Sequence, residues 1–424
     1  MTKTILRKKP TFTPGPVATP VSQPQKPTFG LKPRAPQVGP YKLFAICPGG
    51  LDEVLKREVE QLPAKVTHIY PGGVEFEGNL ELAYRATMKL RTASRVLLLI
   101  KNFKKIFKPE ELYEAIYAID WSHYFSPEST FAIYLTESNT KPRRIPIKPQ
   151  FWALKAKDAI VDQFQERMGT RPNVDRNDPD ITIRLHLHDQ MLKVYLDLSG
   201  PSLHERGYRT ETLEAPIKEN LAAGLLLLAD WDTLCREGNA FLDPFCGSGT
   251  LLVEAALIAT NTAPGLFRTR FGFFSWLDHN PELFEKVHAD LKAERILDPE
   301  KIPPMSGSDR DLQAVRIAKE NLHRAGVIDF VKVKLTPFEE THATVEKGLL
   351  VTNPPYGVRL DEVEELRKTY ADLGSTLKHH YKNWKACVIT SEKSLLHSIG
   401  LKPSRKWALH NGPLESQFSI FNLY

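Results

Sequence analysis

Apolar and polar residues alternate along several short runs in the first half of the chain, and this pattern predicts strands. The runs ITIRLHL at 181–187 and LKVYLDL at 192–198 flank His188-Asp189-Gln190, which predicts a hairpin. At 51–62 the apolar residues recur at helical spacing instead. We expect further strands at 41–47, 74–78 and 95–103, and a helix at 81–90. Small mixed α+β modules are therefore expected between residues 41 and 200.

The second half of the chain alternates apolar strands with helices. Residues 241–243 run through a turn containing Pro and Gly into an apolar helix at 251–259. The same reading gives strands at 305–309, 329–335, 349–352 and 386–392, a long helix at 361–381 and a closing hairpin around Asn411-Gly412. This alternation predicts an α/β domain.

The turn after the first of these strands is a candidate ligand site. Asp243 ends the strand, and Gly247 and Gly249 are expected to leave room for a ligand to approach the backbone. The free N–H groups where the following helix begins favour negative charge. A dinucleotide site fits less well, because the third glycine of G-x-G-x-x-G is missing and the aspartate precedes the turn.

A second strand exit carries Asn353-Pro354-Pro355-Tyr356-Gly357. Ligands of open α/β sheets bind outside the carboxyl ends of the strands. We therefore expect the glycine turn and this segment to face one crevice.

Together, DPFCGSGT and NPPYG resemble the Rossmann-like methyltransferases that use S-adenosylmethionine to modify exocyclic amino groups of bases. The resemblance implies S-adenosylmethionine as the cofactor and a catalytic segment made of Asn353, Pro354, Pro355 and Tyr356. It implies a cofactor site that includes Asp243, Phe245, Cys246, Gly247, Ser248, Gly249 and Thr250.

The chemistry of amino methylation is consistent with this segment. The lone pair of an exocyclic amino group is delocalised into the ring, so the nitrogen is a poor nucleophile. The Asn353 side-chain oxygen and the Pro354 carbonyl oxygen are acceptors that would draw the nitrogen toward tetrahedral geometry, and the prolines would hold them rigid. Tyr356 would stack on a base that has left its helix. The reaction needs no metal, and we expect none.

Over about 380 residues the chain resembles the THUMP-domain ribosomal RNA guanine-N2 methyltransferases of the bacterial large subunit. It matches the half that some bacteria fuse to a second methyltransferase. The resemblance is carried by RPNVDRNDPDI, SLHERGYR, APIKE, LDPFCGSGTLLVEAALIA, APGLFRTRFGF, GSD, NPPYGVRL and NGPLE. Phe271 stands where a Trp is usual.

This resemblance extends the expected cofactor site to the PIKE-like segment, with Pro216, Lys218 and Glu219, in a helix that Pro216 would start. Asp309 is expected to accept hydrogen bonds from ribose hydroxyls, whereas Asp311 either shares this role or caps the next helix. Many relatives have an aspartate near position 336 that contacts adenine. This chain has Thr336-Pro337-Phe338 there, so the adenine contact stays open, with Phe338 as a weak candidate for stacking.

RNA is the expected partner, and the basic residues are unevenly placed. Residues 1–40 hold seven Lys/Arg and no acid, so the rest of the chain sums to −1 out of a total of +6. Basic residues lie among aromatic ones at 101–108 and 141–157, a mixture that suits RNA, although a solvated helix face explains it as well. The residues expected to contact RNA are Arg143, Arg144, Lys148, Arg206, Arg209, Arg268 and Arg270.

Four regions are expected: a disordered basic tail at 1–40, a ferredoxin-like region at 41–80, a THUMP domain at 81–200 and the methyltransferase domain at 201–424. The four cysteines have no CxxC spacing, and His186 and His188 lack a third ligand, which argues against structural zinc. No apolar run is long enough to span a membrane and no secretory signal is evident, so a cytoplasmic protein is expected.

Two other functions stay open. Adenine-N6 methyltransferases also use NPPY, so adenine in RNA or DNA is the nearest alternative substrate. A catalytically silent RNA-binding assembly factor is the second alternative. The sequence does not specify the modified nucleotide or the oligomeric state.

Overall fold

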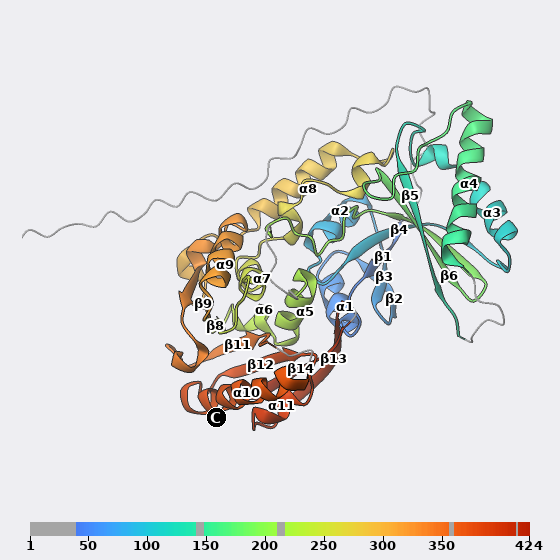
Figure 1. The fold of residues 1–424 in the computed structure, drawn as a ribbon. Helices are drawn as coiled ribbons and strands as arrows, with labels where there is room; N and C mark the ends of the chain where they lie inside the picture. The colour runs from blue at the N-terminus through green and yellow to red at the C-terminus, as the bar shows by residue number, and fades with distance from the viewer. Residues whose placement is uncertain (1–39, 141–147, 210–216, 356–359, 413) are drawn as a thin grey trace, which may run out of the picture.

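The computed structural model describes residues 40–140, 148–209, 217–355, 360–412 and 414–424. Two seven-stranded sheets organise these residues, one in each half of the chain (Figure 1). A single core cluster of buried apolar residues runs from the first sheet to the helices of the second, so the two halves pack on a continuous interior.

The first sheet has the strand order β2-β3-β1-β4-β7-β6-β5, and its neighbours are antiparallel except for the parallel pair β5 and β6. Residues that point to one face, such as Leu43, Phe76 and Leu185, are buried, whereas the opposite face is more polar. The strands are β1 (Tyr41–Ile46), β2 (Lys65–Tyr70), β3 (Gly73–Gly78), β4 (Arg95–Phe103), β5 (Phe131–Ser138), β6 (Ile181–His188) and β7 (Met191–Asp197). The helices of this half are α1 (Asp52–Glu60), α2 (Leu80–Lys89), α3 (Pro109–Tyr117) and α4 (Pro149–Met168).

The second sheet has the order β10-β9-β8-β11-β12-β14-β13 and is parallel from β10 to β12. Its strands are β8 (Ala240–Asp243), β9 (Met305–Asp309), β10 (Val331–Leu335), β11 (Gly348–Thr352), β12 (Lys385–Thr390), β13 (Arg405–Asn411) and β14 (Leu414–Asn422). The α/β fold and the predicted hairpins β6–β7 and β13–β14 are confirmed.

Helices cover both faces of the second sheet. Apolar residues of α7 pack in the main core with Phe241, Leu349 and Val351, while Tyr370 and Leu373 of α10 pack with Leu350 on the other face. The helices are α5 (Glu219–Leu228), α6 (Trp231–Leu234), α7 (Thr250–Ala259), α8 (Pro281–Ala293), α9 (Leu312–Arg324), α10 (Leu360–His380) and α11 (Leu395–Ser398). Short 3₁₀ turns occur at 121–123, 264–267, 272–275, 299–301, 328–330 and 338–340.

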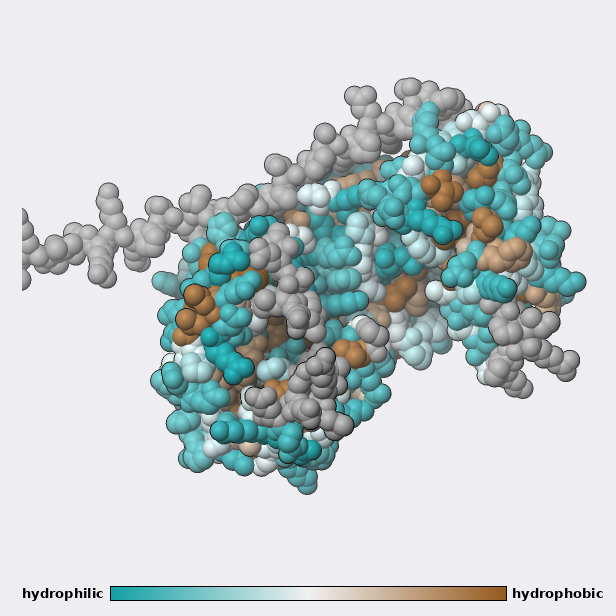
Figure 2. Space-filling view, viewed as in Figure 1, coloured by the Kyte–Doolittle hydropathy of each residue, from teal (hydrophilic) through white to brown (hydrophobic). Residues whose placement is uncertain are grey.

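Ion pairs also join the two halves. Helix α8 lies along α2, and Arg85 of α2 pairs with Asp290 at 2.7 Å and with Glu294 at 3.4 Å (Figure 1). The surface in this view is mostly hydrophilic, with hydrophobic residues in separate patches (Figure 2). Within the described ranges, no helix is both long and apolar enough to cross a membrane.

Candidate active site

Three strands of the second sheet end side by side at one edge. Asp243 ends β8 and Asp309 ends β9, while Asn353 directly follows β11. Since β8 pairs in parallel with both β9 and β11, the parallel sheet brings these residues to the same edge. The prediction of one shared crevice edge is consistent with this topology.

The glycine turn is tied to the neighbouring strand and to α9. The Cys246 amide donates to the Ser308 carbonyl oxygen at 3.0 Å, and the Gly247 amide donates to Asp309 Oδ2 at 2.9 Å. The Asn321 side-chain amide donates to the Ser248 carbonyl oxygen at 2.8 Å. The turn is therefore held by the neighbouring strand β9 and by helix α9.

The two glycines of the turn have positive φ angles, 50° at Gly247 and 79° at Gly249. A Cβ atom added at Gly249 would lie 2.9 Å from the Ala318 Cβ atom of α9. The expectation that Gly249 leaves room for a ligand is thus not met, since the protein itself fills that space. Gly249 is required for its backbone conformation and for the close approach of α9.

Asp243 is a buried carboxyl group, with 1% of its surface exposed. The Thr352 hydroxyl donates to it at 2.8 Å and the Phe245 amide at 3.3 Å. Burial raises the pKa of Asp243 to about 7, because the charged form loses its hydration. This hydrogen bond joins the end of β8 to the end of β11, one residue before Asn353. The sequence analysis did not predict this role for Thr352.

Asp309 and Asp311 have different roles. Asp309 accepts from the Gly247 amide and, through Oδ1, from the Asp311 amide at 3.0 Å. Asp311 is the N-cap of α9 and accepts from the Gln313 amide at 2.8 Å. The capping alternative for Asp311 is confirmed.

The catalytic segment leaves the buried strand β11 and comes to the surface. Asn353 is half-buried, Pro354 is buried and Pro355 is exposed, whereas Tyr356 lies outside the described residues. Among the described residues, none forms a hydrogen bond with the Asn353 side chain. Within the described ranges, its acceptor oxygen therefore has no partner in the fold.

The rings near the glycine turn pack on each other. Phe245 lies against Phe338, with ring centroids 5.5 Å apart, and Phe338 also stacks on Tyr381 at 6.3 Å. Phe338 is 3% exposed, so it belongs to the core and offers no open ring face. The suggestion that Phe338 stacks on a ligand is not supported by this geometry.

The PIKE-like segment lies next to the turn. Helix α5 begins at Glu219, with exposed Lys218 as its N-cap, so the helix does not start at Pro216, which lies outside the described residues. Glu219 is buried and pairs with Arg209 Nε at 3.3 Å. Burial raises the pKa of Glu219 despite the neighbouring guanidinium.

Two of the arginines expected to contact RNA are structural instead. Arg206 is 1% exposed, pairs with Glu254 at 3.5 Å and donates to the carbonyl oxygens of Leu203 and Arg91. Arg268 donates to the carbonyl oxygens of residues 199, 201, 202 and 205, and burial lowers its pKa to about 10. Neither guanidinium is available to phosphate groups.

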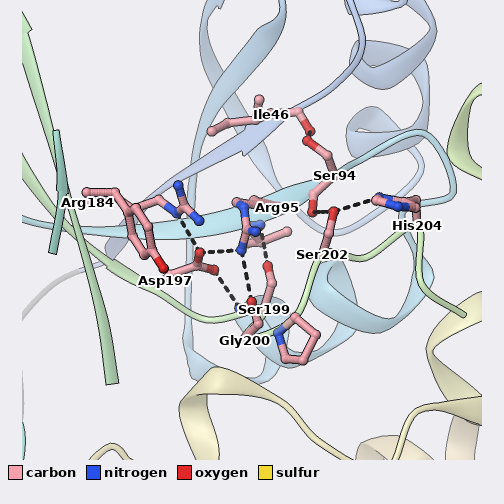
Figure 3. A network of polar contacts seen from close by, with 12 residues as sticks. Ile46, Ser94, Arg95, Arg184, Asp197, Ser199, Gly200, Ser202 and His204 are labelled. Carbon is pink, nitrogen blue, oxygen red and sulfur yellow. Dashed lines mark hydrogen bonds and ion pairs between the residues drawn. The ribbon is translucent and has the colours of Figure 1, made fainter. Parts of the chain in front are cut away.

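The loop that Arg268 holds is fixed from the first sheet as well. Asp197 accepts from Arg95 at 2.7 Å and from Arg184 at 2.6 Å, and Arg95 also donates to the Gly200 carbonyl oxygen at 2.9 Å (Figure 3). An ionic network around the buried Asp197 thus fixes the start of the connection between the two halves.

The remaining arginines and the lysine differ in exposure. Arg270 pairs with Asp178 and donates to the Pro179 carbonyl oxygen, so its charge is already partly compensated. Arg209 is mostly buried, and its guanidinium contacts Glu219, Ile217 and Thr250 of the protein. Lys148 is exposed at the start of α4, whereas Arg143 and Arg144 lie outside the described residues.

No cluster of metal ligands is present among the described side chains. Thr136 and Ser138 contact His186 at 3.0 and 3.1 Å, and Ser138 contacts His188 at 2.9 Å. The two histidines occupy polar positions on the outer face of β6, as expected.

Both halves of the chain match known protein families. The RMKL-like methyltransferase domain matches residues 206–420, the THUMP domain matches 108–197 and the RlmL ferredoxin-like domain matches 42–97. The "Ribosomal RNA large subunit methyltransferase K/L" of Syntrophotalea carbinolica is 41% identical over 91% of this chain. The protein of the same name from Methylococcus capsulatus is 40% identical over 90% of it. The chain spans about half the length of these relatives, 54% and 51%.

Solved structures agree with the fold. The structure described as "SMU.472, a putative methyltransferase complexed with SAH" is 30% identical, with a TM-score of 0.80 over 92% of this chain and 99% of its own. A possible methylase from Clostridium difficile 630 is 29% identical, with a TM-score of 0.81 over 91% of this chain and 98% of its own. A predicted N6-adenine-specific DNA methylase from Listeria monocytogenes is 28% identical, with a TM-score of 0.80 over 91% of this chain and 97% of its own. The resemblance drawn from the sequence motifs is confirmed, and the chain belongs to the RMKL-like methyltransferase family.

Proposed function

We propose that this chain uses S-adenosylmethionine to methylate the exocyclic N2 amino group of a guanine in RNA, namely the 23S RNA of the large ribosomal subunit. The observation that carries the proposal is the placement of Asn353 beside the glycine turn. A half-buried acceptor with no partner in the described fold stands at the edge where Asp243 and Asp309 end their strands. The curated relatives, named as ribosomal RNA methyltransferases, support the choice of RNA.

The residues at this edge fit the proposed cofactor. Helix α7 begins at Thr250 and has no side chain capping its first N–H groups, which suits a carboxylate. Asp309 offers acceptor oxygens of the kind that bind ribose hydroxyls. S-adenosylmethionine, when bound, supplies an electrophilic methyl group that already carries positive charge at its sulfur.

The protein's own contribution is to prepare the amino group. The Asn353 side-chain oxygen and the Pro354 carbonyl oxygen accept its two hydrogen atoms, and the nitrogen lone pair is thereby directed away from the ring. Because β11 and the hydrogen bond from Thr352 to Asp243 fix the start of this segment, the acceptors need little reorganisation. Pro355 has a fixed φ angle and also restricts the conformation of Pro354 before it.

The RNA partner is proposed to bind through the first half of the chain, with Lys148, Arg143 and Arg144 among the contacting residues. The THUMP match at 108–197 includes all three positions. Arg206, Arg209 and Arg268 are excluded from this set, since they are engaged inside the protein.

The test is methylation of a large-subunit RNA transcript with labelled S-adenosylmethionine, followed by digestion and mass spectrometry of the nucleosides. Label in N2-methylguanosine is expected. Label in N6-methyladenosine would instead support the activity named for the Listeria neighbour. Absence of S-adenosylmethionine binding by calorimetry would indicate a silent RNA-binding factor.

A further inference from the structure

Arg209 lies where two helices begin. Its Nη2 atom donates to the Thr250 hydroxyl oxygen at 2.7 Å and to the Ile217 carbonyl oxygen at 3.0 Å, and its Nε atom lies 3.3 Å from Glu219 Oε1. Thr250 is the first residue of α7, and Glu219 is the first residue of α5. One guanidinium therefore fixes the starts of both helices relative to each other.

The residues just before Arg209 hold α7 one turn further along. The Tyr208 hydroxyl donates to Glu254 Oε1 at 3.1 Å, and Arg206 pairs with the same carboxylate. Positions 250 and 254 lie on the same face of a helix, because residues four apart are neighbours there. The segment 206–209 thus runs along one side of α7 and contacts it at two successive turns.

The same segment reaches the first half of the chain. Arg206 donates to the Arg91 carbonyl oxygen, and Arg91 donates to the Leu257 carbonyl oxygen of α7 at 3.1 Å. Helix α7 is consequently tied to segment 206–209 at its start and middle, and to Arg91 near its end.

Burying such charges does little for stability by itself, because the desolvation of each ion offsets most of the attraction between them. An apolar side chain would pack in the same place at lower cost. What a guanidinium adds is geometry, since its planar donors hold several acceptors in a fixed arrangement. Here the acceptors belong to the start of α7, which directly follows the glycine turn, and to the start of α5.

We propose that Arg209 is a positioning residue for the cofactor turn. It does not touch the reacting atoms, and it sets the start of α7 against residues 217–219 so that the turn is ready to bind S-adenosylmethionine. This inference depends on the proposed function, because it assigns Arg209 to the affinity for that cofactor. It also replaces the expectation that Arg209 contacts RNA.

The experiment measures the affinity for S-adenosylmethionine by calorimetry and the thermal unfolding of the ligand-free protein. Arg209→Gln removes the charge and most donors, and Arg209→Lys keeps the charge without the planar fork. We expect each to weaken binding by about tenfold or more, which corresponds to about 1.4 kcal/mol or more, because the cofactor would then have to order the turn when it binds.

The control is Arg85→Gln. Arg85 also bridges two helices through Glu81, Asp290 and Glu294, but it lies on α2, away from the turn. This variant is expected to lower the unfolding temperature and leave the cofactor affinity within about twofold of wild type, because distant sites act independently.

A second pair of variants applies if Arg209→Gln does not fold. Thr250→Val removes the hydroxyl that accepts from Arg209, whereas Thr250→Ser keeps it. Because Thr250 itself belongs to the expected cofactor site, weak binding by the valine variant with recovery in the serine variant supports the assignment only when it is coupled to Arg209. The Arg209→Lys and Thr250→Val effects should also be less than additive when combined.

The outcomes separate the two proposals. If wild type does not bind S-adenosylmethionine, the proposed function fails. If wild type binds and the Arg209 variants bind equally well with a lower unfolding temperature, Arg209 is only structural and the inference is overturned. A loss of RNA affinity with unchanged cofactor affinity would overturn it in favour of the earlier expectation.

Discussion

The two sheets contain buried aspartates that are treated in opposite ways. Asp197, at the end of β7, has no exposed surface and is paired with Arg95 and Arg184. Asp243, at the end of β8, is equally buried but accepts only from a hydroxyl and an amide among the described residues, and its pKa rises to about 7. A buried charge with two ionic partners fixes the geometry of a connection. A buried charge without an ionic partner is energetically costly, and such groups are frequent at functional sites.

The strand directions account for this difference. In the mostly antiparallel first sheet, the ends of neighbouring strands point in opposite directions and polar ends are dispersed. In the parallel part of the second sheet, the carboxyl ends of β8, β9 and β11 meet at one edge. The parallel sheet thus gathers the candidate catalytic and cofactor-binding residues at one edge, whereas the polar residues of the first sheet are spread over its surface.

The largest expected effect comes from the pH dependence of Asp243. Because its folded pKa is raised from 3.8 to about 7, the folded state binds more protons than the unfolded state between these values. The contribution of the Asp243 carboxyl group to the free energy of unfolding therefore falls as pH rises from about 4 to 7, by at most about 4 kcal/mol, and is constant above pH 7. In urea unfolding, Asp243→Asn should lack this decrease in the free energy of unfolding. The stability of the variant relative to wild type should therefore increase as pH rises from about 4 to 7.

Asp197→Asn is the matched control for this measurement. It leaves Arg95 and Arg184 without their shared carboxylate, so it should be less stable than wild type at neutral pH, where the ion pairs are formed. If the free energy of unfolding depends on pH in the same way for Asp243→Asn and for wild type, the carboxyl group of Asp243 does not have a raised pKa.

The next effect concerns Asn353. Asn353→Ala should lower the rate of methyl transfer by about 10²–10³-fold, since losing one preorganised polar group costs about 2.7–4 kcal/mol in the barrier. Affinity for S-adenosylmethionine should be nearly unchanged, because the proposed contact is with the base. Single-turnover methylation of an RNA transcript measures the first quantity and calorimetry the second. Full turnover by the variant would show that the proposed mechanism is wrong.

Much of the second sheet could be predicted because its strands are apolar and its turns carry glycine and proline. The first sheet was harder to predict: β5 contains Tyr134, Thr136 and Ser138 on its outer face, and its strand character depends on pairing with β6. Helix α4 has apolar residues on several sides, so its sequence lacks the single apolar stripe that would predict a helix.

The site was predictable to the extent that the motifs specify it. Asp309 could be identified from its place at a strand end, but Thr352 and Glu254 could not, because their roles come from contacts between distant segments. The arginines show the same limit. Arg206 and Arg268 have the residue type that binds phosphate, and only the fold shows that carbonyl and carboxylate oxygens of the protein already engage them.

The smallest expected effect tests the surface role of the first half. Replacing Arg143, Arg144 and Lys148 by Gln should weaken RNA binding and flatten its dependence on salt, because each lost phosphate contact reduces the slope of log K against log salt by about 0.7–0.9. Affinity for S-adenosylmethionine should be unchanged, since these residues belong to the other half.

Arg270→Gln is the control: its partner Asp178 already compensates the charge, so the salt dependence should change little. Titration of a labelled RNA at several salt concentrations measures both. If the triple variant keeps the wild-type slope, the basic residues before α4 form a solvated surface, and the RNA must be held elsewhere on the first sheet.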